Sequence, residues 1–167
     1  MGSQKWMSAA LLLCMSMAWG KEPSFFEKAK QPYTFVPVYQ VYTPTEDGQD
    51  TIETRMDVAF KSKKKNMALL MLYTKVKQAH SSESLQGLSH ILFNCRNQSI
   101  SYGQSYVSMS ETEDEVMPLE LQTAFQTQEQ MLAEGLYEGQ GKQERAMAID
   151  LTQKMFTRLN EVACVNR

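Results

Sequence analysis

The chain has 167 residues, of which 43% are hydrophobic and 22% charged, and its formal net charge is −2 at pH 7. This length is enough for one domain with a substantial core. A charge so close to neutral excludes the strongly basic overall balance that is typical of nucleic-acid-binding proteins, so no nucleic-acid partner is expected.

Residues 1–20 have the features of a secretory signal peptide. A single positive charge, Lys5, precedes the apolar run Ala9–Leu13, and Ala18–Gly20 offers small residues where a signal peptidase reads the chain. The apolar run is too short for a permanent membrane anchor, and no later segment has transmembrane length. We therefore expect a single exported domain over residues 21–167.

Two cysteines remain after the signal peptide is removed. Cys14 leaves with that segment unless it is lipidated, and Leu13 in the preceding position disfavours lipidation. Cys95 and Cys164 are then an isolated pair in an oxidising compartment, which predicts a disulfide; two buried free thiols are the alternative. Closing this long loop would contribute about 4 kcal/mol through the unfolded state.

Strands are the elements expected ahead of Cys95. Residues 33–42 are rich in aromatic and β-branched residues, and Pro37 within them indicates an edge strand or a broken one. Clean alternation over Thr51–Phe60 predicts a strand with one buried face. The apolar run Met67–Val76 favours a central strand, with a buried helix as the alternative. Between these two strands, the lysine-rich segment 61–66 is expected to be a solvated turn, with binding of a specific anionic partner as the alternative.

A hairpin is predicted around Cys95, which lies at its bend. Ile91, Phe93 and Cys95 share one face of the first strand by period-two alternation. The same alternation in the return strand places Tyr102 and Tyr106 on one face.

Two helices are expected after this hairpin. Apolar residues at helical spacing between Pro118 and Gly135 predict the first, because proline is tolerated in a first turn and a preceding acidic run suits that end of a helix. Met147, Leu151 and Met155 begin the apolar stripe of a second, C-terminal helix. The expected fold is α+β: an antiparallel sheet with the C-terminal amphipathic helix packed on it, another helix inserted before it, and one disulfide.

No catalytic or metal-binding pattern stands out. His80 and His90 lack the spacing of paired ligands that a zinc site needs, and no segment matches a nucleophile elbow. The sequence therefore predicts no enzyme activity, no metal site and no cofactor. The enzymatic alternative is His90 acting with a carboxylate that folding brings near.

Aromatic residues give the main candidate binding surface. It consists of four strand residues, Tyr39, Tyr42, Tyr102 and Tyr106. The alternative is ordinary sheet packing, because tyrosine suits half-buried strands.

The segments around the hairpin and near the C-terminus resemble the surface-adhesin protein E family of Gram-negative bacteria. The resemblance rests on residues 91–95 (Ile-Leu-Phe-Asn-Cys), the tyrosine-bearing strand 102–106 and the end of the helix at 161–164 (Glu-Val-Ala-Cys), within residues 51–164. It implies an antiparallel sheet tied to the C-terminal helix, and a periplasmic or outer-membrane location. The family includes an adhesin for host matrix proteins that also binds haem, so either partner is expected only through this resemblance.

The sequence thus predicts an exported binding protein without catalytic activity, which engages a protein of the envelope or of a host. The alternative function is a periplasmic inhibitor of a lysozyme-type or other enzyme.

Overall fold

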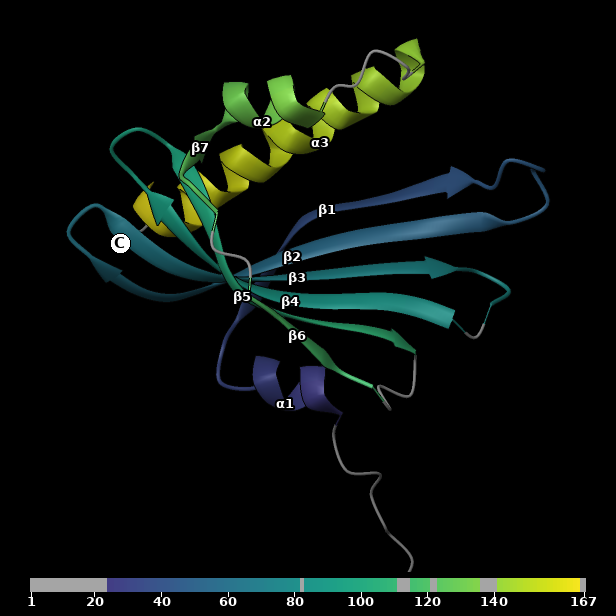
Figure 1. Ribbon diagram of the computed structural model, residues 1–167, viewed down its shortest axis with the longest axis horizontal. Helices are drawn as coiled ribbons and strands as arrows, with labels where there is room; N and C mark the ends of the chain where they lie inside the picture. The colour runs from purple at the N-terminus through teal and green to yellow at the C-terminus, as the bar shows by residue number, and fades with distance from the viewer. Residues whose placement is uncertain (1–23, 82, 111–114, 121–122, 136–140, 166–167) are drawn as a thin grey trace, which may run out of the picture.

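The computed structural model describes residues 24–81, 83–110, 115–120, 123–135 and 141–165 (Figure 1). The predicted signal peptide and Cys14 lie outside this part of the chain. The elements in order are α1 (Phe25–Lys30), β1 (Phe35–Pro44), β2 (Thr51–Lys64), β3 (Met67–Gln78), β4 (Glu83–Asn94), β5 (Ser99–Ser110), β6 (Met117–Glu120), β7 (Gln126–Thr127), α2 (Gln128–Gly135), α3 (Lys142–Asn160) and the π-helical turn η1 (Glu161–Val165).

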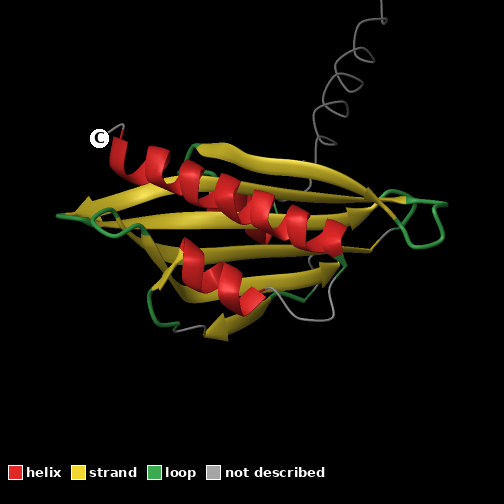
Figure 2. Ribbon diagram, turned by 90° about the horizontal axis from the view of Figure 1, so that it is seen from above, coloured by secondary structure: helices red, strands yellow, loops and turns green. Residues whose placement is uncertain are grey.

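One antiparallel sheet organises the molecule. Its strands run in chain order from β1 to β6, and β7 pairs with β5 beside β6. Helices α2 and α3 lie over one face, and the short helix α1 lies on the other (Figures 1 and 2). The predicted α+β class, the antiparallel sheet, the packed C-terminal helix and the additional helix before it are confirmed.

The main core lies between the sheet and the C-terminal half of α3. Met155, Phe156 and Leu159 of α3 are buried against strand residues, and the Phe156 ring centroid lies 6.4 Å from that of Phe93. The buried members of this cluster are Met56, Val58, Ala68, Leu70, Leu72, Ile91, Phe93, Ile100, Met155, Phe156, Leu159 and Ala163. Because burial is confined to the last turns of α3, this end of the helix fixes it to the sheet.

A second, smaller cluster forms under α1. Phe26 is buried, and its ring centroid lies 6.1 Å from that of Tyr73, while Phe25 lies 5.1 Å from Tyr106. The helix begins at a capping box, in which the side chains of Ser24 and Glu27 each accept a hydrogen bond from the other's backbone N–H. The two phenylalanines at the entry to the fold therefore pack on the domain, on the face opposite α3.

An irregularity in β5 reverses its predicted alternation. Ser89 pairs with Ser105 and Ile91 pairs with Tyr102, so β5 contains one residue more than β4 between these pairs. An extra residue of this kind turns the following side chains to the other face. Tyr102 accordingly packs on the α3 side and Tyr106 on the α1 side. The prediction that both lie on one face is wrong, because alternation alone carries no signal for a bulge.

The helix predicted from Pro118 to Gly135 is shorter than expected. Met117–Glu120 forms strand β6 against β5, and α2 begins only at Gln128. Proline is tolerated in an edge strand, since its missing N–H can face away from the neighbour. Pairing with β5 outweighs the helical spacing, because intrinsic propensity is a weak preference that tertiary contacts override.

Edge strand β1 is attached to α3 by a polar contact. The prediction that Pro37 makes this segment an edge strand is confirmed, because β1 lies at one edge of the sheet and pairs with β2. Arg158 Nε donates a hydrogen bond to the Pro37 carbonyl at 3.0 Å, and its Nη1 lies 2.7 Å from the Glu161 carboxylate. Arg158 thereby satisfies one carbonyl of the open edge.

Candidate functional site

The predicted disulfide is present and joins three chain segments at one end of the sheet. Cys95, in the β4–β5 turn, is bonded to Cys164 in η1 with a Cα–Cα distance of 5.8 Å. The backbone N–H of Cys95 also donates to the Asn66 carbonyl in the β2–β3 turn at 2.7 Å. The bond therefore fastens η1 to two neighbouring hairpins. Since such bonds persist in oxidising compartments, it indicates an exported protein.

His90 borders a shallow cleft on the α1 side of the sheet. The cleft has a volume of about 380 Å³ and is lined in part by Leu69, Leu92, Ser101 and Thr123. Burial and, secondarily, the nearby Lys61 ammonium lower the pKa of His90. No carboxylate lines this cleft, so the described residues place no acidic partner beside the imidazole.

The four tyrosines of the candidate binding surface are divided between the faces. Tyr39 and Tyr102 pack against the core beneath α3. Burial raises the pKa of Tyr39. Burial also raises the pKa of Tyr102, and the nearby Tyr39 hydroxyl adds a smaller effect in the same direction. Tyr106 contacts α1 on the other face, and Tyr42 is exposed near the end of β1, where its hydroxyl accepts from Gln40. The structure therefore brings together Tyr39 and Tyr102 and separates them from Tyr106.

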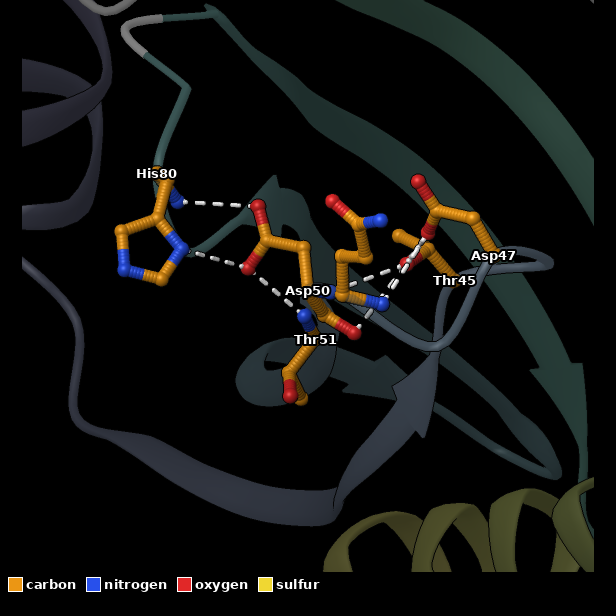
Figure 3. A network of polar contacts seen from close by, with 6 residues as sticks. Thr45, Asp47, Asp50, Thr51 and His80 are labelled. Carbon is orange, nitrogen blue, oxygen red and sulfur yellow. Dashed lines mark hydrogen bonds and ion pairs between the residues drawn. The ribbon is translucent and has the colours of Figure 1, made fainter.

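A polar network that the sequence patterns did not indicate ties two loops at the opposite end of the sheet (Figure 3). Asp50, between β1 and β2, lies 2.9 Å from Nδ1 of His80, between β3 and β4, and it also accepts from the His80 backbone N–H at 3.2 Å. Thr45 and Asp47 form a turn beside it, joined by a 2.5 Å hydrogen bond. The two loops are thus cross-linked by a single carboxylate.

The Asp50 carboxyl is held in its charged form by its hydrogen bonds. The Thr51 backbone N–H, donating at 2.7 Å, has the largest effect, and together with the side chains of Gln78 and His80 it overcomes desolvation to lower the pKa of Asp50 to about 2. A carboxylate with this number of donors acts as a structural connector between loops.

The pKa of Asp50 predicts an acid-dependent loss of stability. Because its pKa falls from 3.8 in the unfolded chain to about 2 in the folded one, its contribution is complete above about pH 4 and is lost as the pH falls towards 2. We expect Asp50→Asn to lose less stability than the native chain between these pH values, measured by urea unfolding at each pH. Glu46→Gln, in the same loop, is the matched control and should follow the native curve. Parallel native and Asp50→Asn curves would contradict the prediction.

The described residues hold no cluster of three or more His, Cys, Asp or Glu side chains with the geometry of a metal site. Within the same part of the chain, no helix combines the length and the apolar character needed to cross a bilayer.

An exposed apolar patch lies beyond the helix-covered core, on the face of the sheet that carries α3. It consists of four residues on the adjacent strands β4, β5 and β6, which we call the open apolar patch: Leu85, Met109, Met117 and Leu119. Their exposed fractions lie between 41% and 64%. Val107 pairs with Met117 and connects the patch across β5 and β6. Contiguous exposed apolar residues on one surface are typical of an interaction site.

Comparison with known proteins identifies no relative, since no family model, curated protein or solved structure matches the chain. The resemblance to the surface-adhesin protein E family therefore stays a prediction from the sequence. A functional assignment has to rest on the chemistry of the surfaces described above.

Proposed function

We propose that this chain is an exported, non-enzymatic binding protein, similar to the surface-adhesin protein E family, whose partner is a protein of the bacterial envelope or of a host surface. The open apolar patch carries the proposal. Its four side chains lie outside the area that α3 covers, and their contact with water is unfavourable unless a partner covers them. The four residues belong to strands of the sheet, which hold a binding surface more rigidly than loops do.

The position of the patch on the sheet supports this function. Leu85 pairs with Val76 of β3, and Leu119 pairs with Ser105 of β5, so the patch continues the face whose other end forms the main core. A surface built from core-type side chains without a covering helix resembles the centre of a protein interface. The periplasm or the outer membrane is the location that the family resemblance favours.

Substitution of the patch tests the proposal. Leu85→Ser combined with Met117→Ser should reduce the recovery of bound envelope or host-matrix proteins about tenfold or more, since hot-spot truncations at interface centres cost about 2 kcal/mol each. Recovery is measured by affinity capture on the exported chain, with titration of any isolated partner by calorimetry.

The matched control is Leu92→Ser, which makes a similar change at an exposed position on the opposite face. It should leave capture from detergent-solubilised extracts, which contain no bilayers, unchanged, and all three chains should unfold at similar denaturant concentrations. Equal recovery by the native chain and the patch variant would overturn the proposal.

A second candidate, inhibition of a lysozyme-type enzyme, is favoured by the β4–β5 turn. Its exposed residues Arg96–Gln98 follow directly after disulfide-bonded Cys95. The Asn94 side chain accepts from the Arg96 N–H at 3.0 Å, which holds the start of the turn. A loop fixed in this way loses little entropy when it enters an active site. Inhibition of a panel of muramidases, abolished by Arg96→Ala, would support this function, and failure to inhibit any of them would exclude it.

A further inference from the structure

Five exposed cations gather at the disulfide-bonded end of the sheet. Four belong to β2 and the turn that follows it, and the fifth lies in the neighbouring β4–β5 turn; they are Lys61, Lys63, Lys64, Lys65 and Arg96, which we call the cationic tip. The two turns are joined by the hydrogen bond from Cys95 to Asn66. Figure 1 shows both hairpins projecting beyond the sheet at the end that carries η1.

Acidic residues are scarce in the stretch of sequence that carries the cationic tip. Between Asp57 and Glu111 the sequence contains one acidic residue, Glu83, which lies at the opposite end of β4. None of the five cations forms an ion pair within the part of the chain that the structure describes. A chain with a net charge of −2 therefore concentrates positive charge at one end. Such asymmetry creates a local attractive field for anions.

Apolar side chains lie directly beside these lysines: Leu92 is exposed, and Met67 and Leu69 are half-buried. Lys64 pairs with Met67, and Leu69 pairs with Leu92 in the next row of the same face. Leu92 is 40% exposed and, with Leu69, borders the His90 cleft. This face is opposite the one that carries the open apolar patch. The cationic tip is therefore amphipathic, with leucines on the α1 side and ammonium groups around them.

We propose that the cationic tip, together with Leu92, docks the protein on the surface of an anionic phospholipid bilayer. Lysines near a membrane gain from the negative headgroup potential, and an adjacent apolar side chain gains by entering the interfacial region. The combination distinguishes a bilayer from a soluble polyanion, which would use the charges but leave Leu92 without a role. The open apolar patch, on the other face, stays available to the protein partner.

The backbone at the tip adds a second observation. Lys65 has φ of 55°, in the left-handed region that favours glycine or asparagine. A lysine in this turn position places an ammonium group at the outermost point of the hairpin at a cost in local stability.

Vesicle flotation with the exported chain tests the proposal. The native chain should bind phosphatidylglycerol vesicles, bind phosphatidylcholine vesicles much more weakly, and dissociate from the former as salt rises. Lys63→Gln with Lys64→Gln should lower the partition coefficient roughly thirtyfold, given the usual gain per lysine near an anionic surface. Lys142→Gln with Lys154→Gln removes the same charge from exposed positions on α3 and should change it little. Every variant is exported in the same way and has the same N-terminus, so any contribution from that segment cancels in these ratios.

Two further variants distinguish membrane docking from polyanion binding and from loss of the fold. Leu92→Ser should lower vesicle binding about fivefold because part of the leucine surface is transferred on docking. Lys65→Gly should reduce binding about fivefold while its unfolding midpoint stays equal to or above that of the native chain, since glycine relieves the left-handed backbone. Loss of binding in this variant cannot then be assigned to unfolding.

Three results would overturn the proposal: no preference for phosphatidylglycerol, equal effects of the β2 and α3 lysine pairs, or full vesicle binding by Leu92→Ser. The last result, combined with competition by heparin, would instead assign the cationic tip to a soluble polyanion. Capture of a protein partner through the open apolar patch is measured separately, so failure here leaves that proposed function standing.

Discussion

Replacing both Cys95 and Cys164 by alanine is expected to lower the free energy of unfolding by about 4 kcal/mol. The bond closes a loop with a sequence separation of 69 residues, and breaking it releases that constraint in the unfolded chain. Domains of this size typically have only about 5–15 kcal/mol of net stability, so the loss is a large share. Urea unfolding of native and variant chains at neutral pH measures it.

The native chain treated with reductant is the control for the substitutions themselves. It should unfold at nearly the same urea concentration as the double variant, because both lack the bond while only one has altered side chains. Hydrogen exchange should also accelerate in η1 and in the β4–β5 turn, where the bond fastens the chain. Identical midpoints for the oxidised native chain and the double variant would show that the bond contributes nothing to stability.

The second large effect is expected from Phe93→Ala, with a loss of about 3–5 kcal/mol. Phe93 is fully buried in the main core and packs against Phe156 of α3. Its removal leaves a cavity between sheet and helix in addition to the lost transfer free energy. Thermal and denaturant unfolding measure the change.

Leu92→Ala is the matched control, because the neighbouring residue points to the opposite face and is 40% exposed. It should cost less than about 1 kcal/mol, as exposed substitutions usually do. Similar losses at both positions would contradict the alternation on which this part of the fold depends.

Much of the sheet was predictable because its signals are local. Alternation over β2 and β4 correctly placed Met56, Val58, Ile91 and Phe93 on the face that packs against α3, and Pro37 correctly marked the edge. The prediction that β2 has a single buried face is wrong in its middle, because Asp57 and Ala59 on the other face are also buried. The number of cysteines identified the bond between two distant segments, because Cys95 and Cys164 are the two cysteines that remain once the predicted signal peptide is removed.

The remaining features depend on contacts between segments that carry no shared pattern. Helical spacing after Pro118 concealed the strand pairing of β6, although Thr127 and Gln130 cap each other and mark the true start of α2. The bulge in β5 divides its two tyrosines between the faces. The contact between Asp50 and His80 joins polar loops, for which no periodicity exists to guide a prediction.

The positions of the candidate binding surfaces also depend on contacts between distant segments rather than on local signals. The four tyrosines share strand composition, but composition does not specify the face, which depends on register and bulges. The open apolar patch was missed because Leu85, Met117 and Leu119 have the character of core residues. They are exposed because the contact between α3 and the sheet does not extend to them, and that limit cannot be read from the sequence.

The order of the strands has a consequence for how the protein matures. Each strand from β1 to β6 pairs with the next one along the chain, so hairpins can form in succession as the chain is delivered. The main core, however, is completed only by α3, and the disulfide only by Cys164. Both α3 and Cys164 follow all the described strands in the sequence. The apolar face of the sheet therefore stays uncovered until these last elements arrive. A chain that stops before α3 would present most of that face to chaperones and proteases, so oxidation of Cys95 with Cys164 marks a molecule whose core has closed.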